Sequence, residues 1–136
     1  MTPIALPLVA LAIKHAAPRL PRDRRSVVAV LSARVGSISD TRIGGWYGSR
    51  ASKAALNMLV RTASIEIARS RPKAVVAALH PGTVDTPLSA PFQRGVAEGK
   101  LFGSGFAARA LLTVVDGLDA GASGRIFAWD GREIQP

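Results

Sequence analysis

A serine and a lysine one helical turn apart are the residues of this sequence best placed for acid–base chemistry. Ser49 precedes Lys53 by four positions, and residues at this spacing differ by about 40° around a helix, so both side chains reach one site. The lysine ammonium would favour the ionised form of an acid beside it. A tyrosine phenol, with an ordinary pKa of about 10, suits this role, whereas the hydroxyl of Ser49 is a much weaker acid with a shorter reach.

Tyr47, the only tyrosine of the chain, does not replace that phenol in an ordinary helix. Its six-residue distance from Lys53 corresponds to about 240° of rotation, which places it on another face. Tyr47 could take the role only if the helix began later or its first turn were distorted. A hydrolytic dyad is another interpretation of Ser49 and Lys53, although nothing else in the sequence suggests the oxyanion hole that it needs.

The surrounding sequence predicts the helices that position these residues. Residues 3–17 are apolar at helical spacing and predict a helix that ends at Pro18. Residues 47–69 predict a long helix, with an apolar surface so wide that we expect burial on two sides. A long loop over residues 81–104 leads to a third helix near residues 106–118. The expected buried face of the first helix consists of Ile4, Leu8, Leu11, Ala12 and Ala16.

Three short apolar runs predict strands. Residues 26–31 and 74–79 are unbroken and rich in β-branched residues, which is typical of parallel strands covered on both faces. Residues 125–129 predict a third strand that ends in a turn at Asp130-Gly131. The alternation of helices and strands predicts an α/β fold with a parallel sheet. Three strands are few for such a sheet and leave an exposed edge, so the pattern indicates part of a larger sheet.

The composition indicates which kinds of ligand and partner this chain is suited to bind. The net charge is +9, with 18 Lys+Arg against 9 Asp+Glu, which favours nonspecific attraction to anionic surfaces. Aromatic residues are few, so we interpret the basic cluster as a solvated loop and do not expect a nucleic-acid partner. The chain has no cysteine, and His15 and His80 have no companions at ligand spacing, so no metal site is predicted. The clustered basic residues are Arg19, Arg22, Arg24 and Arg25.

The length predicts a single domain over residues 1–136. No apolar run approaches the length of about 20 residues that a membrane span needs. Residues 4–12 resemble the apolar part of a secretion signal, but no basic residue precedes Lys14, as such a signal requires. We therefore expect a buried helix that begins at Pro3, and a cytoplasmic protein.

Several motifs in one order resemble those of the short-chain dehydrogenases/reductases. The segment GGWYGSRASKAALN at residues 44–57 is similar to the family's active-site helix, whose motif is Tyr-x-x-x-Lys. Residues 26–36 are similar to its fifth strand and the serine loop that follows, and HPGTVDT at residues 80–86 resembles the segment after its sixth strand. Residues 124–131 are similar to the seventh strand of a bacterial branch related to the C-factor proteins. The resemblance therefore extends along the chain.

This resemblance implies the C-terminal portion of a doubly wound Rossmann-type parallel sheet, comprising strands five to seven with their helices and lacking the N-terminal nucleotide-binding half. It implies oxidoreduction of a carbonyl or alcohol with NAD or NADP as the cofactor. By resemblance Lys53 would bind the nicotinamide ribose, and a serine ahead of the helix would steady the substrate oxygen. The residues implied at the nicotinamide and the phosphates are Pro81, Gly82, Thr83, Val84 and Thr86.

The sequence departs from the family pattern at the catalytic positions. Ser49 occupies the tyrosine position and Ala33 the serine position, which leaves Ser32 and Ser37 as candidates for the serine role. A loop hydroxyl that satisfies local backbone groups is the other interpretation of both serines. Residues 103–108 match Gly-x-Gly-x-x-Ala, but we reject them as the family's glycine-rich turn because they follow a Pro-rich loop rather than a strand.

Two functions remain after this comparison. The first is a truncated relative of the dehydrogenases that is inactive alone, because neither the tyrosine nor the glycine-rich turn is among its residues. The second is a non-catalytic interaction module. In the family, the active-site helix and the helix before it pack against another subunit. Residues 3–17 and 47–69 would therefore pair with a second copy or with an intact homologue.

Overall fold

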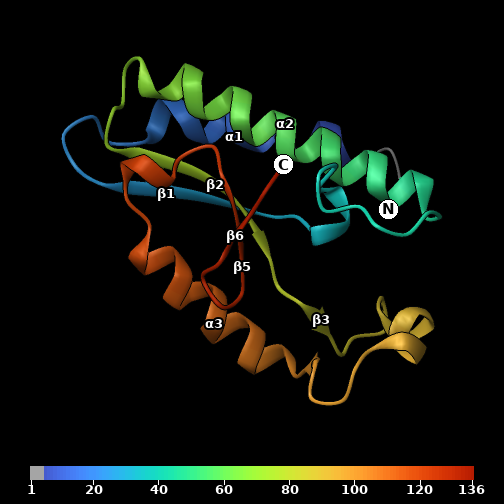
Figure 1. The fold of residues 1–136 in the computed structure, drawn as a ribbon. Coiled ribbons are helices and arrows are strands. Elements are labelled where there is room, and N and C mark those ends of the chain that lie inside the picture. Colours follow the sequence, from blue (N-terminus) through green and yellow to red (C-terminus); the bar gives the residue numbers. More distant parts are fainter. Residues whose placement is uncertain (1–4) are drawn as a thin grey trace.

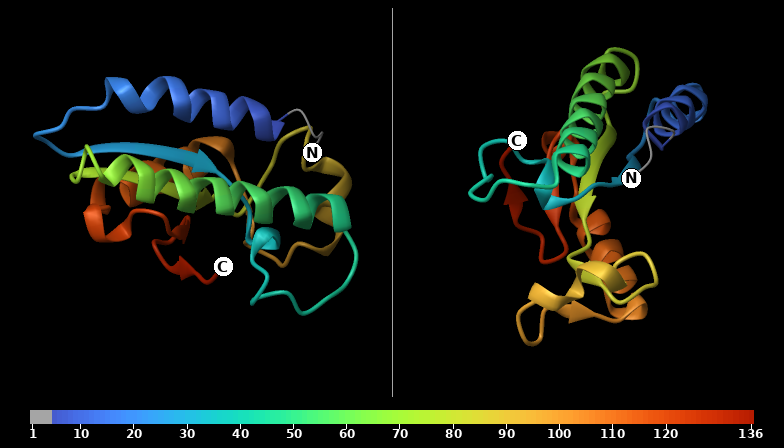
Figure 2. Two further views of the ribbon diagram at one scale, coloured as in Figure 1. Left: turned by 90° about the horizontal axis from the view of Figure 1, so that it is seen from above. Right: turned by 90° about the vertical axis from the view of Figure 1, so that its right-hand side faces the viewer.

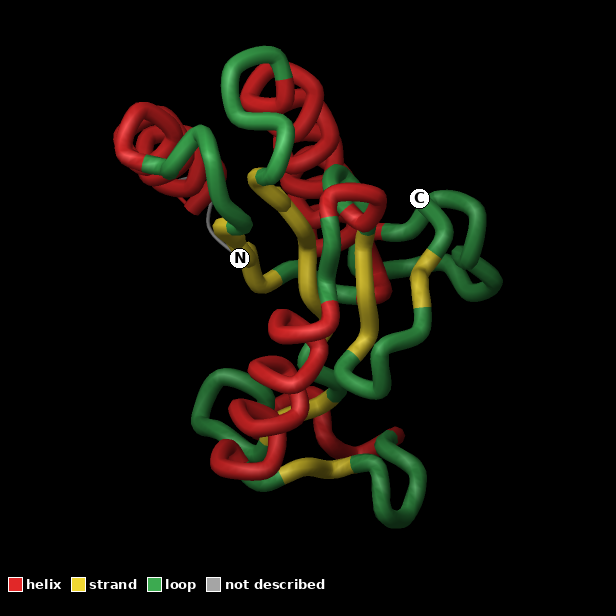
Figure 3. The backbone as a smooth tube through the Cα atoms, turned by 90° about the vertical axis from the view of Figure 1, so that its left-hand side faces the viewer, coloured by secondary structure: helices red, strands yellow, loops and turns green. Residues whose placement is uncertain are grey.

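The computed structural model describes residues 5–136, so the predictions for Pro3 and Ile4 lie outside the described residues. A four-stranded sheet forms the centre, and helices cover both of its faces (Figures 1 and 3). One face carries α1 and α2, and the other carries α3. The helices are α1 (Ala5–Ala16), α2 (Tyr47–Ala68) and α3 (Ser104–Gly117), with short 3₁₀ turns η1 (Ala17–Arg19), η2 (Arg34–Gly36), η3 (Ala90–Gly95) and η4 (Ala120–Ala122).

The sheet confirms the three predicted strands and adds a fourth. The strand order is β1-β2-β5-β6, with β1 parallel to β2 and β2 parallel to β5. The last strand, β6, is antiparallel to β5 and was not predicted, because it has only two residues. A turn at Gly131, whose φ of 83° favours glycine, joins this pair. The strands are β1 (Ser26–Leu31), β2 (Ala74–His80), β5 (Ile126–Ala128) and β6 (Glu133–Ile134).

The segment predicted as a loop over residues 81–104 contains a small second sheet. Strand β3 (Thr83–Val84) pairs in parallel with β4 (Leu101–Phe102). These strands are too short to show a period in the sequence, so the prediction of an unbroken loop is wrong at this point. Figure 1 shows this segment extending away from the main sheet beyond the end of β2.

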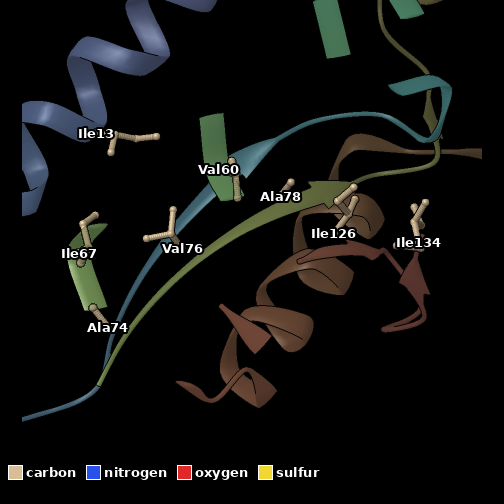
Figure 4. Packing of buried hydrophobic residues seen from close by; sticks show 9 residues of the cluster. Ile13, Val60, Ile67, Ala74, Val76, Ala78, Ile126 and Ile134 are labelled. Atoms are coloured by element: carbon tan, nitrogen blue, oxygen red, sulfur yellow. The ribbon is translucent and has the colours of Figure 1, made fainter. Parts of the chain in front are cut away.

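Two apolar clusters hold the layers together. The larger cluster lies between the sheet and the helices α1 and α2, with Ile13, Val60 and Ile67 of the helices facing Val76 and Ile126 of the strands (Figure 4). The smaller cluster lies between the sheet and α3. It consists of Val75, Ala77 and Leu118, with Val27, Val114, Ala122 and Phe127 packed against it.

The buried face of α1 differs from the one predicted. Ile13 is 8% exposed and packs on the sheet together with Val9. Leu8 and Leu11, which were expected to be buried, are 60% and 49% exposed. The apolar stripe of α1 is wider than the surface that this chain offers to it, so the prediction of a single buried face was wrong.

Within residues 5–136, α2 is covered where it faces the main sheet and α1, and its outer side is exposed. Leu56, Val60 and Ile67 are buried against the sheet, whereas Met58 and Ile65 are 66% and 49% exposed. The expected burial on two sides is therefore found in part: α2 packs on the sheet and contacts α1, whereas the side with Met58 and Ile65 is exposed. No helix within residues 5–136, α2 included, combines the length and the apolar character needed to cross a membrane.

Part of the basic cluster has a structural role. The Arg25 guanidinium donates to the carbonyl of Leu118 at 2.7 Å and to that of Asp116 at 3.3 Å. It thus binds carbonyl groups at the C-terminal end of α3, where a positive charge is favourable. This contact fixes α3 to the start of β1 and accounts for one of the four clustered arginines.

Candidate functional site

The turn after β1 lies directly on α2 beside Lys53. A Cβ at Gly36 would lie 2.6 Å from both the carbonyl carbon and the Cβ of Lys53, so only glycine permits this approach. The next residue, Ser37, is buried, donates its hydroxyl hydrogen to the carbonyl of Gln135 and accepts from the N–H of Asp40 at 3.1 Å. Ser37 therefore ties the loop to the C-terminal segment, which is the role of a loop hydroxyl.

Helix α2 begins at Tyr47 with a regular first turn. Trp46 precedes it in the left-handed region, with a φ of 54°, and its carbonyl accepts from the N–H of Arg50 at 2.9 Å. The alternative in which Tyr47 replaces the missing phenol required a later or distorted start, and neither is present. The Tyr47 side chain is 84% exposed. It lies on a different face of α2 from Lys53.

Lys53 extends from α2 to the carboxyl end of β1. Its Nζ donates to the carbonyl of Leu31 at 3.0 Å, and partial burial lowers the pKa of the ammonium. Ser49, one turn earlier on the same face, is partly buried. The pair is therefore placed at the edge of a parallel sheet where α/β proteins bind ligands.

A buried hydrogen bond between a serine and an asparagine links the end of β1 to α2, one helical turn after Lys53. The Ser32 hydroxyl donates to Oδ1 of Asn57 at 2.7 Å, and both residues are buried. Asn57 follows Lys53 by one turn of α2, and its Nδ2 has no partner among the residues that the structure describes. Asn57 is a site residue that was not predicted, although an asparagine within the apolar stripe of a helix is itself a signal. The Ser32 hydroxyl is therefore bonded to a side chain of α2 and not to local backbone groups.

His80 ends β2 next to this group. Its Nδ1 accepts from the backbone N–H of Arg34 at 3.3 Å, which links the loops after β1 and β2. Burial and the positive charge of Arg34 lower the pKa of His80 to about 4, against an opposing effect of Asp130. The imidazole is therefore neutral near physiological pH.

The segment after β2 turns at Gly82 and packs against aromatic rings. Gly82 has a φ of 76°, and a Cβ there would lie 2.6 Å from the ring of Phe102 and 3.2 Å from that of Trp129. The centroids of those two rings are 4.6 Å apart. The absence of a side chain at Gly82 therefore makes room for the rings of Phe102 and Trp129.

The remaining predicted cofactor residues follow this turn. Thr83 and Val84 form β3, and Pro81 directly precedes Gly82. Thr86 pairs with Ser89 in a local turn: each backbone N–H donates to the other hydroxyl, at 3.3 and 3.4 Å. The hydroxyl of Thr86 therefore satisfies local backbone groups.

The structure brings two groups of predicted residues to one edge of the sheet. Ser49, Lys53 and Ser32 gather at the end of β1, and the segment 81–84 follows the end of β2. The two strand ends are neighbours, because Leu31 and Leu79 are register partners. By contrast, the Ser37 hydroxyl is bonded to the carbonyl of Gln135, and the Tyr47 side chain is exposed to solvent.

The prediction for the segment that precedes the glycine pattern at residues 103–108 is wrong in one respect. Strand β4 immediately precedes it and α3 follows, so the statement that no strand comes before it is wrong. However, β4 has two residues and pairs with β3, outside the four-stranded sheet. The βαβ context of a dinucleotide-binding turn is therefore not found within residues 5–136.

These residues fit the nicotinamide end of a dinucleotide but not the whole of it. Lys53 offers a donor at the carboxyl edge, and Thr83 lies on the adjoining segment. The pyrophosphate needs backbone N–H groups of a glycine-rich turn at a helix start, and the sequence has no such turn that follows a strand of the main sheet.

Solved structures define the class of protein to which this fold and site correspond. The chain superimposes on the NADPH-bound carbonyl reductase from chicken fatty liver with a TM-score of 0.75 and 26% sequence identity. The match covers 98% of this chain and 54% of that one. Together with the Ser49–Lys53 helix at the carboxyl edge, it shows that the chain corresponds to the C-terminal half of a short-chain dehydrogenase/reductase domain.

Among curated proteins, the chain is similar to C-signal of Myxococcus xanthus. The two are 39% identical over 118 residues, which is 86% of this chain and 65% of C-signal. The 1-hydroxy-2-glutathionyl-2-methyl-3-butene dehydrogenase of Rhodococcus sp. (strain AD45) is 35% identical over 108 residues, with 79% and 46% covered. The chain thus spans between 46% and 65% of the length of these relatives. No family model matches it.

Proposed function

We propose that this chain is a cytoplasmic relative of the NAD(P)-dependent short-chain dehydrogenases/reductases that does not catalyse oxidoreduction alone. The observation that carries the proposal is the residue one turn before Lys53, which is Ser49. A serine hydroxyl is too weak an acid to exchange a proton with a substrate oxygen near neutral pH, even beside an ammonium group.

The neighbouring hydroxyls support the proposal. Ala33 has no hydroxyl, Ser32 donates to Asn57 and Ser37 donates to Gln135. Within residues 5–136, each serine of the loop after β1 that was considered for the catalytic role is thus bonded to another part of the protein. A replacement donor for the missing phenol would have to break one of these contacts, at a cost of about 1 kcal/mol or more.

Calorimetric titration of NADH and NADPH into the 136-residue chain tests the proposal. We expect no saturable heat at millimolar cofactor, since residues 5–136 offer donors for the nicotinamide end but no glycine-rich turn of the main sheet for the pyrophosphate. Lys53→Ala is the site variant, and Lys14→Ala, an exposed lysine of α1, is its matched control. Micromolar binding that Lys53→Ala abolishes and Lys14→Ala retains would overturn the proposal.

A turnover assay adds a second test that does not depend on affinity. We expect no oxidation of NADPH with a panel of aldehydes and ketones by the wild-type chain. Ser49→Tyr restores a phenol one turn before Lys53 and tests whether the proton donor is the sole defect. Measurable turnover by the wild-type chain would refute the proposed inactivity.

An interaction module is a second candidate, and the exposed apolar side of α2 favours it. Met58 and Ile65 are 66% and 49% exposed, and they lie seven positions apart on one helix face. Together with α1 they would pair with a second copy or with an intact homologue. Size-exclusion chromatography with light scattering should then show a stable dimer that Met58→Lys with Ile65→Lys converts to a monomer. Leu112→Lys, at an exposed position of α3, is the control. A monomeric or aggregated wild-type chain would contradict pairing with a second copy.

A further inference from the structure

The side chain of Lys53 makes few contacts for a partly buried ammonium group. Its Nζ donates to one neutral acceptor, the carbonyl of Leu31, at 3.0 Å. An ammonium group has three donors, and within residues 5–136 this one forms no ion pair with a carboxylate. A neutral amine has fewer donors to satisfy and keeps a lone pair, which is the form that acts as a nucleophile. The contacts of Lys53 therefore suit a neutral amine.

The residue one turn earlier leaves the charge of Lys53 without a partner. A phenol at that position would ionise beside the lysine, and its anion would hold the ammonium in the charged form. Ser49 carries a hydroxyl that stays neutral near physiological pH. Partial burial lowers the pKa of Lys53, and no carboxylate paired with it counters that effect in the described part of the chain. The serine at position 49 thus favours the free amine of Lys53.

The other three lysines of the chain provide a contrast. Lys14, Lys73 and Lys100 are exposed, whereas Lys53 is partly buried. Lys73 donates to the carbonyl of Asp23 at 2.8 Å, and Nζ of Lys100 lies 5.7 Å from the centre of the Trp129 ring. Hydration favours the charged form of an amine, and burial disfavours it. Lys53 is therefore the lysine whose surroundings best support a nucleophilic amine.

The position of Lys53 leaves its Nζ open to a small molecule. Figure 2 shows the end of β1 and the loop that follows it lying beside the first half of α2. The turn at Gly36 rests on the backbone of Lys53, and the side chain extends to the end of β1, where its bond to Leu31 is exposed. The Leu31 side chain itself is 58% exposed. A ligand can therefore approach Nζ from solvent, past an apolar side chain.

We infer that Lys53 is a nucleophile that captures small aldehydes as imines. The inference rests on the proposed function, because a lysine bound to a nicotinamide ribose or paired with a phenolate would not be free to react. The Nζ lone pair attacks the carbonyl carbon, the nitrogen releases a proton, and the carbonyl oxygen takes one up to give a carbinolamine. That oxygen then leaves as water while the C=N bond forms. One amine and one aldehyde thus give one imine and one water, and nothing is oxidised or reduced.

The surroundings of Lys53 favour an aldehyde over a ketone. The carbon of an aldehyde carries one substituent and a hydrogen, so it meets less obstruction beside α2 and the turn at Gly36. Ser49 lies one turn before Lys53 on the same face, where its hydroxyl can donate a hydrogen bond to the carbinolamine oxygen. Such a bond does not require the serine to give up its proton, so its weak acidity is no obstacle.

The test is reductive trapping of the 136-residue chain with propanal and sodium cyanoborohydride, which converts an imine to a stable secondary amine. After a short exposure without any nicotinamide cofactor, peptide mapping by mass spectrometry gives the labelling rate of each lysine. We expect Lys53 to be labelled about tenfold faster than Lys14, Lys73 and Lys100, which serve as internal controls. The contrast should vanish in the urea-unfolded chain. Equal rates at all four lysines of the folded chain would overturn the inference.

A variant of Ser49 tests the cause of the reactivity. Ser49→Tyr places a phenol beside Lys53 and should slow the labelling of this lysine about tenfold, because the phenolate stabilises the ammonium. Thr113→Tyr, at an exposed position of α3, is the matched control and should leave the rate unchanged. Circular dichroism confirms that each variant is folded, and the comparison among the wild-type lysines needs no variant. An unchanged rate in folded Ser49→Tyr would overturn the inference, yet it would leave the proposed inactivity standing, since cofactor binding and turnover are measured without aldehyde trapping.

Discussion

Strands β1 and β2 are neighbours in register and have similar sequences, SVVAVL and AVVAALH, yet their surroundings are opposite. Six of the seven residues of β2 are buried, whereas none of the six residues of β1 is. Both sequences suit a strand that is covered on two faces and paired on two edges. The difference shows that the apolar character of β1 exceeds what is needed to pack it against the residues that the structure describes.

The largest predicted effect tests this comparison at one register position. Ala77 is fully buried on β2, and its partner Ala29 is exposed on β1. Ala77→Asp places a carboxylate in the apolar layer under α3 and should lower the free energy of unfolding by about 4 kcal/mol or more. Ala29→Asp should change it by about 0.5 kcal/mol or less in the isolated chain. Urea unfolding measures both, and equal losses would remove the distinction between the strands.

The second prediction extends the comparison to the two sides of α2. Leu56 is 1% exposed and Met58 is 66% exposed. Leu56→Ala leaves a cavity against the sheet and should cost about 3 kcal/mol, while Met58→Ala should cost about 0.5 kcal/mol or less. Thermal unfolding at a protein concentration that keeps the chain monomeric gives both values. A large loss for Met58→Ala in the monomeric chain would mean that the two sides of α2 do not differ in their contribution to stability.

The third prediction concerns the carboxyl end of β1, where the strand is held tightly despite its free edge. Gly36→Ala forces a methyl group against the backbone of Lys53 and should cost about 2 kcal/mol. Gly44→Ala is the matched control, because no atom lies within 4 Å of the added Cβ. Chemical denaturation compares the two, and an unchanged stability for Gly36→Ala would show that η2 is free to move away from α2.

The last prediction is the pH dependence contributed by His80 at the end of β2, an effect that accumulates gradually over the acid range. The unfolded chain binds a proton to this histidine near pH 6.5, but the folded chain binds it only near pH 4. The free energy of unfolding should therefore be greatest above pH 6.5 and fall on acidification, by about 1 kcal/mol per pH unit between those values.

His80→Asn should reduce the fall in the free energy of unfolding on acidification. His15→Asn, at an exposed position of α1, should leave that fall unchanged. Urea unfolding repeated across the acid range provides the measurement. A fall of the same slope in wild type and His80→Asn would assign the effect to other groups.

The sequence was sufficient for the main elements because each has a clear period or composition. The three helices and the strands β1, β2 and β5 were predicted, and so was the parallel pairing of these strands. The antiparallel strand β6 and the β3–β4 pair were not, since two-residue strands depend on tertiary contacts and leave no pattern. The exposed flank of α1 was also missed, because periodicity shows an apolar face but not whether the chain contains its cover.

The sequence predicted which helix carries the site, but it did not predict which serine hydroxyls are hydrogen-bonded to other parts of the protein. The four-residue spacing placed Ser49 and Lys53 on one face of α2. Which serine is free depends on contacts between distant segments, such as the one from Ser32 to Asn57, which are 25 positions apart. Such a contact follows from the packing of α2 on the sheet and has no local signature.

The bond between Ser37 and Gln135 has a consequence for the order of folding. It joins residues separated by 98 positions, and the N–H of Ser39 donates to the carbonyl of Pro136 at 3.1 Å beside it. Contacts of such long sequence separation form late, because the chain between them must first lose much of its freedom. The loop that leads into α2 should therefore be among the last parts to acquire its native geometry, after the helices and the β1–β2 pair.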